Sequence, residues 1–352
     1  MVIKLRNLGD VVLTVPVFRA LKDNFLHAHI AALVNSGTEE AIKGLKYIDE
    51  IIVFNRKIKD LFLINRLIKE VSFIKEVRNG KFDVTIDLTS GDRGCILSFF
   101  SGAKTRIAYD PKNSGFWGKR FLYSHLIEKD ETLHVVLQNL NILRILGISS
   151  ANTNLDFYIP EHDKDYIERV LFHENKIQKD KDKIIHIHPV ARWLFKCWKD
   201  EYMAEIISWL IDNGVKVIIT SSRERKEIEK IKKILNLVSN KFKRDNLLDL
   251  SGKTNIKQLA AISLNSDIFF GVDSAPMHIA AAVGTPVVAL FGPTDERHWG
   301  PWGKNHTVIR ASLSCMPCKK GSCEGILPRK CMVAIEPKVV KKVIEDRLND
   351  RK

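Results

Sequence analysis

The sequence predicts an α/β protein with two Rossmann-like, doubly wound domains facing each other across a cleft. Short β-branched, apolar runs alternate with amphipathic helical stretches in both halves of the chain, which is typical of helices layered on parallel sheets. The chain has 352 residues, more than one typical domain needs. A polar, turn-rich stretch near residues 149–160 separates the halves, so we expect the domain boundary there.

Strands and helices alternate from the start of the first half. Each expected strand is a short apolar run bounded by polar or turn residues. These strands cover residues 2–5, 29–34, 50–54, 82–88 and 105–109. Apolar residues at helical spacing predict helices at 11–22, 61–78 and 133–146. Together they form the first predicted domain, residues 1–155.

The second half repeats the alternation. Expected strands cover 184–188, 215–220, 247–250, 267–272 and 286–291. Expected helices cover 200–213, 225–235, 256–264 and 276–283. This second domain spans 156–335, and a final helix within 336–352 is expected to pack back on the first domain.

Composition narrows the class of protein. With 45% hydrophobic and 28% charged residues, the chain is globular. No apolar run approaches the roughly 18–20 residues of a membrane span, and the start lacks a signal-peptide pattern, so we expect a cytoplasmic protein. The net charge of +14 favours anionic partners. That charge is spread along the chain, without a basic arm or a basic–aromatic stripe, so nucleic acid is not expected.

The first candidate site is "KLRNLGDVVLTVPVFRAL", residues 4–21. A strand ends near Leu5, Gly9 permits a tight turn, and Asp10 opens the following helix. Asp10 there has two interpretations. It is either a helix N-cap or a general base at the carboxyl end of a strand.

The second candidate is "GVDSAPMHIAAAVGTP", residues 271–286. A buried strand ends at Asp273, Ser274 is placed to cap the next helix, and Pro276 fits its first turn. His278 lies in the first turns, where the helix dipole opposes a charged imidazole, so we expect it to be neutral. The stretch is either an ordinary strand–turn–helix or a diphosphate site at a helix N-terminus.

The third candidate is "HPVARWLFKCWKDEYMAEI", residues 188–206. Arg192 and Lys196 would supply cations for a phosphate, and Trp193 or Trp198 an apolar wall. A basic loop with two core tryptophans is the alternative. The fourth candidate, "FGPTDERHWGPWGKN" at 291–305, is either a rigid anion-binding loop or a plain surface turn.

In this order the four stretches resemble glycosyltransferase family 9, the lipopolysaccharide heptosyltransferases. The amino-terminal Gly-Asp of that family matches Gly9 and Asp10. Its Asp-Ser/Thr-Gly/Ala-Pro-x-His box matches residues 273–278, and its Gly-Thr-Pro and Phe-Gly-Pro-Thr-Asp continuation matches 284–286 and 291–295. The stretch "ARWLFKCW" looks most like the heptosyltransferase III branch, which adds a side-branch heptose to the inner core.

The resemblance implies a GT-B fold and inverting, metal-independent heptose transfer from ADP-heptose to the lipid A-core oligosaccharide, at the cytoplasmic surface of the inner membrane. Asp10 matches the general base of the family and Lys196 its diphosphate contact. Gly9 and Arg93 are expected on the acceptor side, and the run "SSRERKE" places Glu224 or Glu227 at the ribose. The full set of expected donor contacts is Arg192, Lys196, Glu224, Asp273, Ser274, Ala275, Met277, His278, Gly292 and Thr294.

The expected acceptor is anionic and held in the membrane, which would account for the basic net charge of the chain. "PKNSGFWGKRF" combines cations with aromatics in a way that suits an anionic lipid surface, unless Phe116 and Trp117 fold into the core. The expected membrane contacts are Lys112, Phe116, Trp117, Lys119 and Arg120.

Four of the six cysteines, Cys315, Cys318, Cys323 and Cys331, have the count of a zinc site. Their irregular spacing favours reduced structural thiols, with zinc next and a disulfide last. Three rival functions stay open: a family 9 enzyme using another core position or nucleotide sugar, a sugar-nucleotide epimerase, and a basic nucleotide- or RNA-binding protein.

Overall fold

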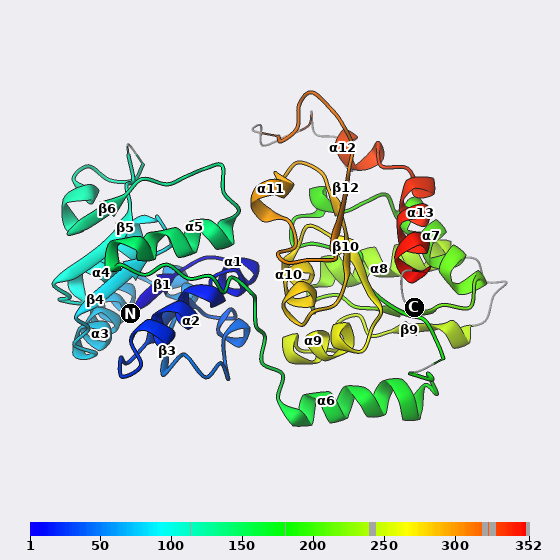
Figure 1. Cartoon of the computed structure of the whole chain (residues 1–352), viewed down its shortest axis with the longest axis horizontal. Helices are drawn as coiled ribbons and strands as arrows, with labels where there is room; N and C mark the ends of the chain where they lie inside the picture. Colours follow the sequence, from blue (N-terminus) through cyan, green and yellow to red (C-terminus); the bar gives the residue numbers. More distant parts are fainter. Residues whose placement is uncertain (113, 180, 239–243, 319–322, 324–328, 350–352) are drawn as a thin grey trace. The chain divides into compact units, whose positions relative to one another are not determined.

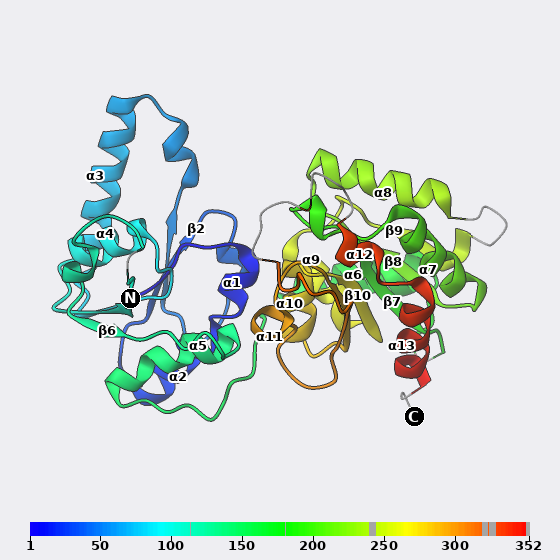
Figure 2. The same cartoon turned by 90° about the horizontal axis from the view of Figure 1, so that it is seen from above.

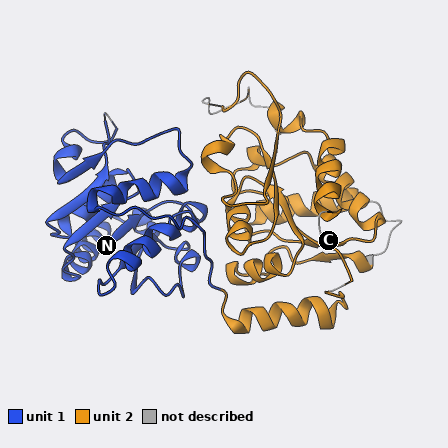
Figure 3. Ribbon diagram, in the orientation of Figure 1, with its two compact units in different colours: residues 1–158 blue, residues 159–352 orange. Residues whose placement is uncertain are grey.

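The computed structural model describes residues 1–112, 114–179, 181–238, 244–318, 323 and 329–349. The chain divides into unit 1, Met1–Tyr158, and unit 2, Ile159–Lys352 (Figure 3). Each unit contains one six-stranded sheet whose strands are all parallel, with helices on both faces (Figure 1). Of the helices in the described ranges, none combines the length and apolar composition that a bilayer span needs.

Unit 1 has the strand order β3-β2-β1-β4-β5-β6. Five of these strands were predicted; the sixth, β6, which has three residues and none of them buried, was missed. The strands are β1 (Val2–Lys4), β2 (Ala31–Asn35), β3 (Glu50–Phe54), β4 (Val84–Asp87), β5 (Thr105–Tyr109) and β6 (His125–Ile127). The helices are α1 (Leu8–Val12), α2 (Val15–Asn24), α3 (Leu63–Asn79), α4 (Asp92–Phe100) and α5 (Val135–Asn141).

Unit 2 has the strand order β12-β11-β10-β7-β8-β9. Its edge strand β12 was not predicted. The strands are β7 (Ile184–His188), β8 (Lys216–Ile219), β9 (Leu247–Asp249), β10 (Ile268–Val272), β11 (Val287–Phe291) and β12 (Thr307–Arg310). The helices are α6 (Glu161–Glu168), α7 (Asp200–Asp212), α8 (Arg225–Leu237), α9 (Ile256–Leu264), α10 (Ala275–Ala282), α11 (Glu296–Trp299), α12 (Lys330–Val333) and α13 (Pro337–Asn349).

Both sheets have the same doubly wound topology. Along the chain, each follows the order 3-2-1-4-5-6, which reverses direction between its first and fourth strands. That switch point lies between β1 and β4 in unit 1 and between β7 and β10 in unit 2. Ligands of such sheets bind beyond the carboxyl ends of the strands at the switch point. The predicted α/β fold class is confirmed, and it locates one candidate site in each unit.

The last helix, α13, belongs to unit 2. Its side chains Val340, Ile344 and Leu348 are buried in the same apolar cluster as Met203 and Ile207 of α7. Its apolar stripe is thus buried within unit 2, and the expected packing of this helix on the first domain stays a prediction.

Candidate functional site

The loop after β1 carries the first predicted site residues. Helix α1 begins at Leu8 with Asn7 as its N-cap, so Gly9 is buried inside the helix instead of forming the turn, and Asp10 occupies the third helical position. The backbone nitrogen of Asn7 donates to Oδ2 of Asp10 at 3.2 Å. Asp10 is thus a capping partner but not the N-cap itself. Its carboxylate is partly exposed, so the capping role and the general-base role are compatible.

Hydrogen bonds across the switch point of unit 1 fix the position of this loop. The backbone nitrogen of Leu5 donates to Oγ1 of Thr89 at 2.9 Å. The guanidinium of Arg6 donates to the carbonyl oxygen of Thr89 at 2.8 Å. Thr89 lies two residues after β4, so the residues before Asp10 are held against the end of the neighbouring strand.

Lys4, at the end of β1, is a buried cation that the sequence analysis did not single out. Its Nζ donates to the carbonyl oxygen of Leu88 at 3.1 Å and to Oδ1 of Asn139 at 3.3 Å. Burial lowers the pKa of Lys4 to about 8, and the negative charge of Asp10 acts in the opposite direction. The ammonium of Lys4 therefore contributes positive potential near the carboxyl end of β1, the strand end that Asp10 follows.

Arg93, the other residue expected on the acceptor side, holds structural elements together. Its Nη1 donates to both carboxylate oxygens of Glu70 at 2.8 Å. Its guanidinium lies 4.3 Å from the ring centroid of Phe54. These contacts tie α4 to α3 and β3, and a contact of Arg93 with an acceptor stays a prediction.

In unit 2, Lys196 and Asp273 form an ion pair across the switch point. Lys196 ends a short 3₁₀ turn after β7, and Asp273 directly follows β10, the neighbouring strand. Their Nζ and Oδ2 atoms are 2.6 Å apart. Asp273 is 7% exposed, and its backbone nitrogen bonds to the carbonyl oxygen of Leu290 at 3.2 Å. The structure thus brings together two of the expected donor contacts, Lys196 and Asp273.

The N-terminus of α10 lies directly after this pair. Ser274 occupies the N-cap, but its Oγ donates to the carbonyl oxygen of Val272 at 3.1 Å and makes no side-chain cap. The first turn and its positive dipole end are therefore not capped by a side chain. The amide of Met277 bonds to the carbonyl oxygen of Ser274, and the side chains of Met277 and His278 are buried. Ser274 and Ala275, which are partly exposed, are the better candidates for a donor contact.

Gly292 begins the loop after β11, and packing explains the glycine. A Cβ atom there would lie 2.5 Å from Sδ of Met332 and 3.1 Å from Sγ of Cys331. The space beside Gly292 is therefore filled by α12. Asp295 caps α11, and hydrogen bonding from Arg297 lowers the pKa of Asp295 to about 2. Thr294, between these residues, is partly exposed.

The loop that carries Lys196 rests on a stack of aromatic and guanidinium groups. The rings of Trp193 and Phe195 are stacked with centroids 6.1 Å apart, and the guanidinium of Arg329 lies 4.1 Å from the Phe195 ring. Arg329 was missed because it lies far along the chain. Trp193 and Arg192 are exposed. Trp198 is 1% exposed and belongs to the core, so it forms no ligand wall.

The two glutamates considered for a ribose contact differ in burial. Glu227 is 4% exposed, and its Oε2 accepts a hydrogen bond from the backbone nitrogen of Ser222 at 3.0 Å. It therefore fixes the loop after β8. Glu224 is exposed at the N-cap of α8, and it stays the predicted ribose contact.

Two histidines of β7 form a buried polar cluster that the sequence analysis did not predict. Nε2 of His186 and Nδ1 of His188 lie 2.7 and 2.9 Å from Oγ1 of Thr220. Burial lowers the pKa of His188 to about 3 and that of His186 well below its usual value. Both rings are neutral in the folded protein at neutral pH.

The predicted membrane loop is only partly confirmed as an exposed surface. Trp117 is 96% exposed, so it does not fold into the core, and Phe116 is 40% exposed. Lys119 is 3% exposed, lies 3.2 Å from Asp92 and donates to a backbone carbonyl. The prediction that Lys119 contacts a membrane is wrong because an internal ion pair buries it. Lys112 and Arg120 are exposed and pair with Glu128 and Asp110.

The cysteine cluster forms no metal site within the described residues. Cys315, Cys318, Cys323 and Cys331 are free thiols, and Cys331 is buried against Gly292. Over the described ranges, no three His, Cys, Asp or Glu side chains come together as a set of metal ligands. Most of the segment between Cys318 and Arg329 lies outside those ranges.

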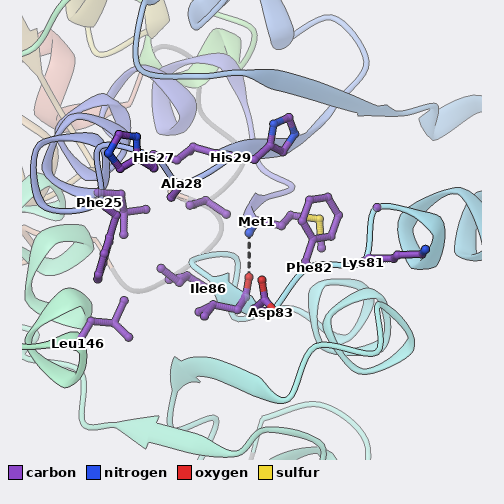
Figure 4. A pocket seen from close by; sticks show the side chains of 15 residues that line it. Met1, Phe25, His27, Ala28, His29, Lys81, Phe82, Asp83, Ile86 and Leu146 are labelled. Atoms are coloured by element: carbon purple, nitrogen blue, oxygen red, sulfur yellow. Dashed lines mark hydrogen bonds between the residues drawn. The ribbon is translucent and has the colours of Figure 1, made fainter.

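Unit 1 also contains a cavity of about 430 Å³, which lies at the amino ends of the strands of its sheet. Met1, Phe25, His27, Phe82 and Leu146 are among its lining residues (Figure 4). These residues surround the amino ends of β1 and β4, whereas Asp10 follows the carboxyl end of β1. The cavity is therefore separate from the predicted site.

Comparison with known proteins places this geometry in a family. Residues 71–325 match the family model of glycosyltransferase family 9 (heptosyltransferase). Lipopolysaccharide heptosyltransferase 3 of Escherichia coli is 31% identical over 300 residues, covering 84% of each chain. Lipooligosaccharide heptosyltransferase 2 of Campylobacter jejuni is 25% identical over 345 residues, covering 97% of this chain and 95% of the relative.

Solved structures with low sequence identity share the fold. The family 9 glycosyltransferase of Veillonella parvula has a TM-score of 0.82 and 23% identity, covering 99% of this chain and 96% of its own. The E. coli heptosyltransferase WaaC with ADP has a TM-score of 0.75 and 18% identity, covering 98% of both chains. The similarity therefore extends over both units.

Proposed function

This chain belongs to glycosyltransferase family 9, and from that premise we propose that it moves a heptose from ADP-heptose to the inner core of lipopolysaccharide, as a heptosyltransferase III-like enzyme. The relatives that are named heptosyltransferase 3 support the choice of branch. A related WaaC structure containing ADP-2-deoxy-2-fluoro heptose supports the choice of donor. The observation that carries the proposal is the Lys196–Asp273 pair at the switch point of unit 2.

Unit 2 is the proposed donor-binding unit. Lys196 would bind the diphosphate together with the amides of the first turn of α10, because a cation and a helix N-terminus both favour an anion. Asp273 would orient Lys196, and Ser274 and Ala275 would line the same turn. Arg192, Thr294 and, at the ribose, Glu224 complete the proposed contacts. Met277, His278 and Gly292 are buried and would shape this site from behind its exposed residues.

Unit 1 is the proposed source of the general base, Asp10. In an inverting displacement, the acceptor oxygen bonds to the anomeric carbon while the bond from that carbon to the diphosphate oxygen breaks. Asp10 takes the proton of the acceptor hydroxyl, and the electron pair of the broken bond leaves with ADP. Lys196 and the N-terminus of α10 would offset the charge developing on the diphosphate, so we propose a reaction that requires no metal.

The test measures ADP release from ADP-heptose with and without a truncated, heptose-bearing core acceptor. We expect acceptor-dependent release that is unchanged by EDTA and gives a product of inverted anomeric configuration. Asp10→Asn should lower the rate by about 10²–10⁴-fold with ADP binding retained, because only general-base catalysis is lost. Asp23→Asn, at an exposed carboxylate of α2, is the matched control.

Two results would overturn parts of this proposal. ADP release that does not depend on any core acceptor would exclude the transferase reaction as written. Full activity of Asp10→Asn would exclude Asp10 as the general base, and the proposed donor site would stand. Transfer from another nucleotide sugar, or to another core position, would keep the family mechanism and change its substrate.

Because lipid A anchors the acceptor, we also propose that the protein acts at the cytoplasmic surface of the inner membrane. The net charge of +14 suits the anionic lipids of that surface. The exposed Trp117 and its neighbours are one surface that could serve this purpose.

A further inference from the structure

The largest group of exposed apolar side chains in the described residues lies on and before α3. Phe62 is 88% exposed, Ile64 73% and Leu63 71%. Only Phe73 and Val77, in the second half of the helix, are buried. We name this group the α3 apolar face: Leu61, Phe62, Leu63, Ile64, Leu67, Ile68 and Val71, each at least 42% exposed.

The spacing of these residues gives α3 a second apolar side. Ile64, Leu67, Ile68 and Val71 follow the i, i+3, i+4, i+7 pattern of one helix side. Phe73 and Val77 point away from that side and pack into unit 1. Scattered exposed apolar residues are normal on a protein surface, but a contiguous group of seven is typical of an interaction site.

Cations lie at both ends of the α3 apolar face. Lys57 and Lys59 precede it, and both are exposed. Farther along the helix, the outward side continues as Lys75 and Arg78. Of the acidic residues nearby, Glu70 is bonded to Arg93, and Asp60 is exposed between Lys59 and Leu61. Apolar side chains bordered by lysines match an anionic lipid interface, where the apolar groups enter the acyl boundary and the ammonium groups meet the headgroups.

The α3 apolar face begins beyond the carboxyl ends of the unit 1 strands, and Asp10 also follows the carboxyl end of a strand. The segment leading to α3 leaves the carboxyl end of β3 at Phe54. There, Nη2 of Arg56 donates to the carbonyl oxygen of Arg6 at 3.1 Å, which joins this segment to the loop between β1 and α1. Figure 2 shows α3 and the segment before it projecting from the sheet of unit 1. A lipid surface bound by α3 would thus meet unit 1 beside its proposed base.

We propose that the α3 apolar face and its flanking lysines are the surface with which this protein docks on an anionic lipid bilayer. The choice of a lipid partner rests on the proposed function, which supplies a lipid-anchored acceptor. The docking itself needs neither donor nor acceptor, so it is measurable separately. The surface around Trp117 is the competing site, since Phe121 there is also 75% exposed.

The test is co-sedimentation of the full chain with vesicles free of lipopolysaccharide. We expect binding to phosphatidylcholine vesicles that contain phosphatidylglycerol, and binding at least about tenfold weaker to pure phosphatidylcholine or in high salt. The variant Leu63→Ser/Ile64→Ser/Leu67→Ser should weaken binding by about tenfold or more. The exposed positions permit folding, which the melting temperature checks. The control, Leu237→Ser/Leu264→Ser, changes two half-exposed leucines of unit 2 and should bind as the wild type does.

Four outcomes overturn the proposal: no binding by the wild type, equal binding to both vesicle types, wild-type binding by the α3 variant, or loss of binding only in Trp117→Ser/Phe121→Ser. A dimer in solution that the α3 variant dissociates would instead assign the face to a second copy of the chain. ADP release with a detergent-dispersed short acceptor should be unchanged in the α3 variant. If vesicles bind but that release fails in the wild type, the proposed function fails and the docking surface stands.

Discussion

The ion pair between Lys196 and Asp273 makes a prediction that separates its structural from its ligand-binding role. Asp273 is 7% exposed and the Lys196 side chain 20%, so the pair lies between a surface pair and a fully buried one. Lys196→Met leaves a buried carboxylate without its cation, and we expect it to lower the free energy of unfolding by about 2–3 kcal/mol. Asp273→Asn leaves a partly hydrated ammonium and should cost about 1 kcal/mol.

The double variant gives the coupling between the two charges. With both charges removed, the loss in unfolding free energy should be smaller than the sum of the single losses by about 1–2 kcal/mol. Urea unfolding followed by tryptophan fluorescence reports mainly on unit 2. Five of the six tryptophans lie there: Trp193, Trp198, Trp209, Trp299 and Trp302.

ADP binding by the same variants tests the ligand role. Lys196→Met should weaken ADP binding by about 10–100-fold, because a hydrogen bond to a charged group contributes about 1.5–3 kcal/mol. Asp273→Asn retains the ammonium and should weaken ADP binding by less, about fivefold at most. Single-variant losses that add to within about 0.5 kcal/mol would refute the pair. Unchanged ADP affinity in Lys196→Met would refute its role at the diphosphate.

Three further predictions test the packing and electrostatics around the donor site. Gly292→Ala should lower the free energy of unfolding of unit 2 by about 1–3 kcal/mol, because α12 fills the space that the new methyl group needs; a neutral effect in urea unfolding would contradict that packing. His186 and His188 have lowered pKa values, so the unfolded chain binds more protons below about pH 6.5, and the stability they contribute is lost as pH falls from there toward 3. Near pH 5 the free energy of unfolding should change by roughly 3 kcal/mol per pH unit for the two groups together, and His188→Asn should reduce that slope. Arg329→Met should weaken ADP binding by about three- to tenfold in calorimetry through loss of the stack under the Lys196 loop, whereas a drop in melting temperature with normal ADP affinity would limit Arg329 to a structural role.

Most strands could be predicted because they are short, largely apolar runs bounded by polar or turn residues. For β3, β5 and β7, the predicted and observed bounds are identical. The edge strands β6 and β12 are short and partly exposed and were missed, whereas the edge strands β3 and β9 were predicted. The helix predicted at 11–22 is two helices, and Pro16 in the first turn of α2 marks the second start.

The candidate site could be predicted in its residues but not in its contacts. Asp10, Lys196 and Asp273 stand out in their local stretches. Lys196 and Asp273 are 77 residues apart in the chain, however, and their bond depends on β7 and β10 being neighbours. Lys119 was misjudged because only the folded chain shows that Asp92 pairs with it. Exposure of the α3 apolar face was equally hidden, since its sequence spacing fits a helix packed on either side.

The central claim is transfer of a heptose to an inner core that already carries heptose. The most direct measurement incubates the protein with ADP-heptose and two lipopolysaccharide core acceptors, one bearing inner-core heptose and one lacking it, and analyses the products by mass spectrometry. A heptosyltransferase III-like enzyme should add one heptosyl residue to the heptose-bearing core alone, and Lys196→Met should add little. Addition only to the core without heptose, or to neither core while ADP-heptose still binds, would contradict the account.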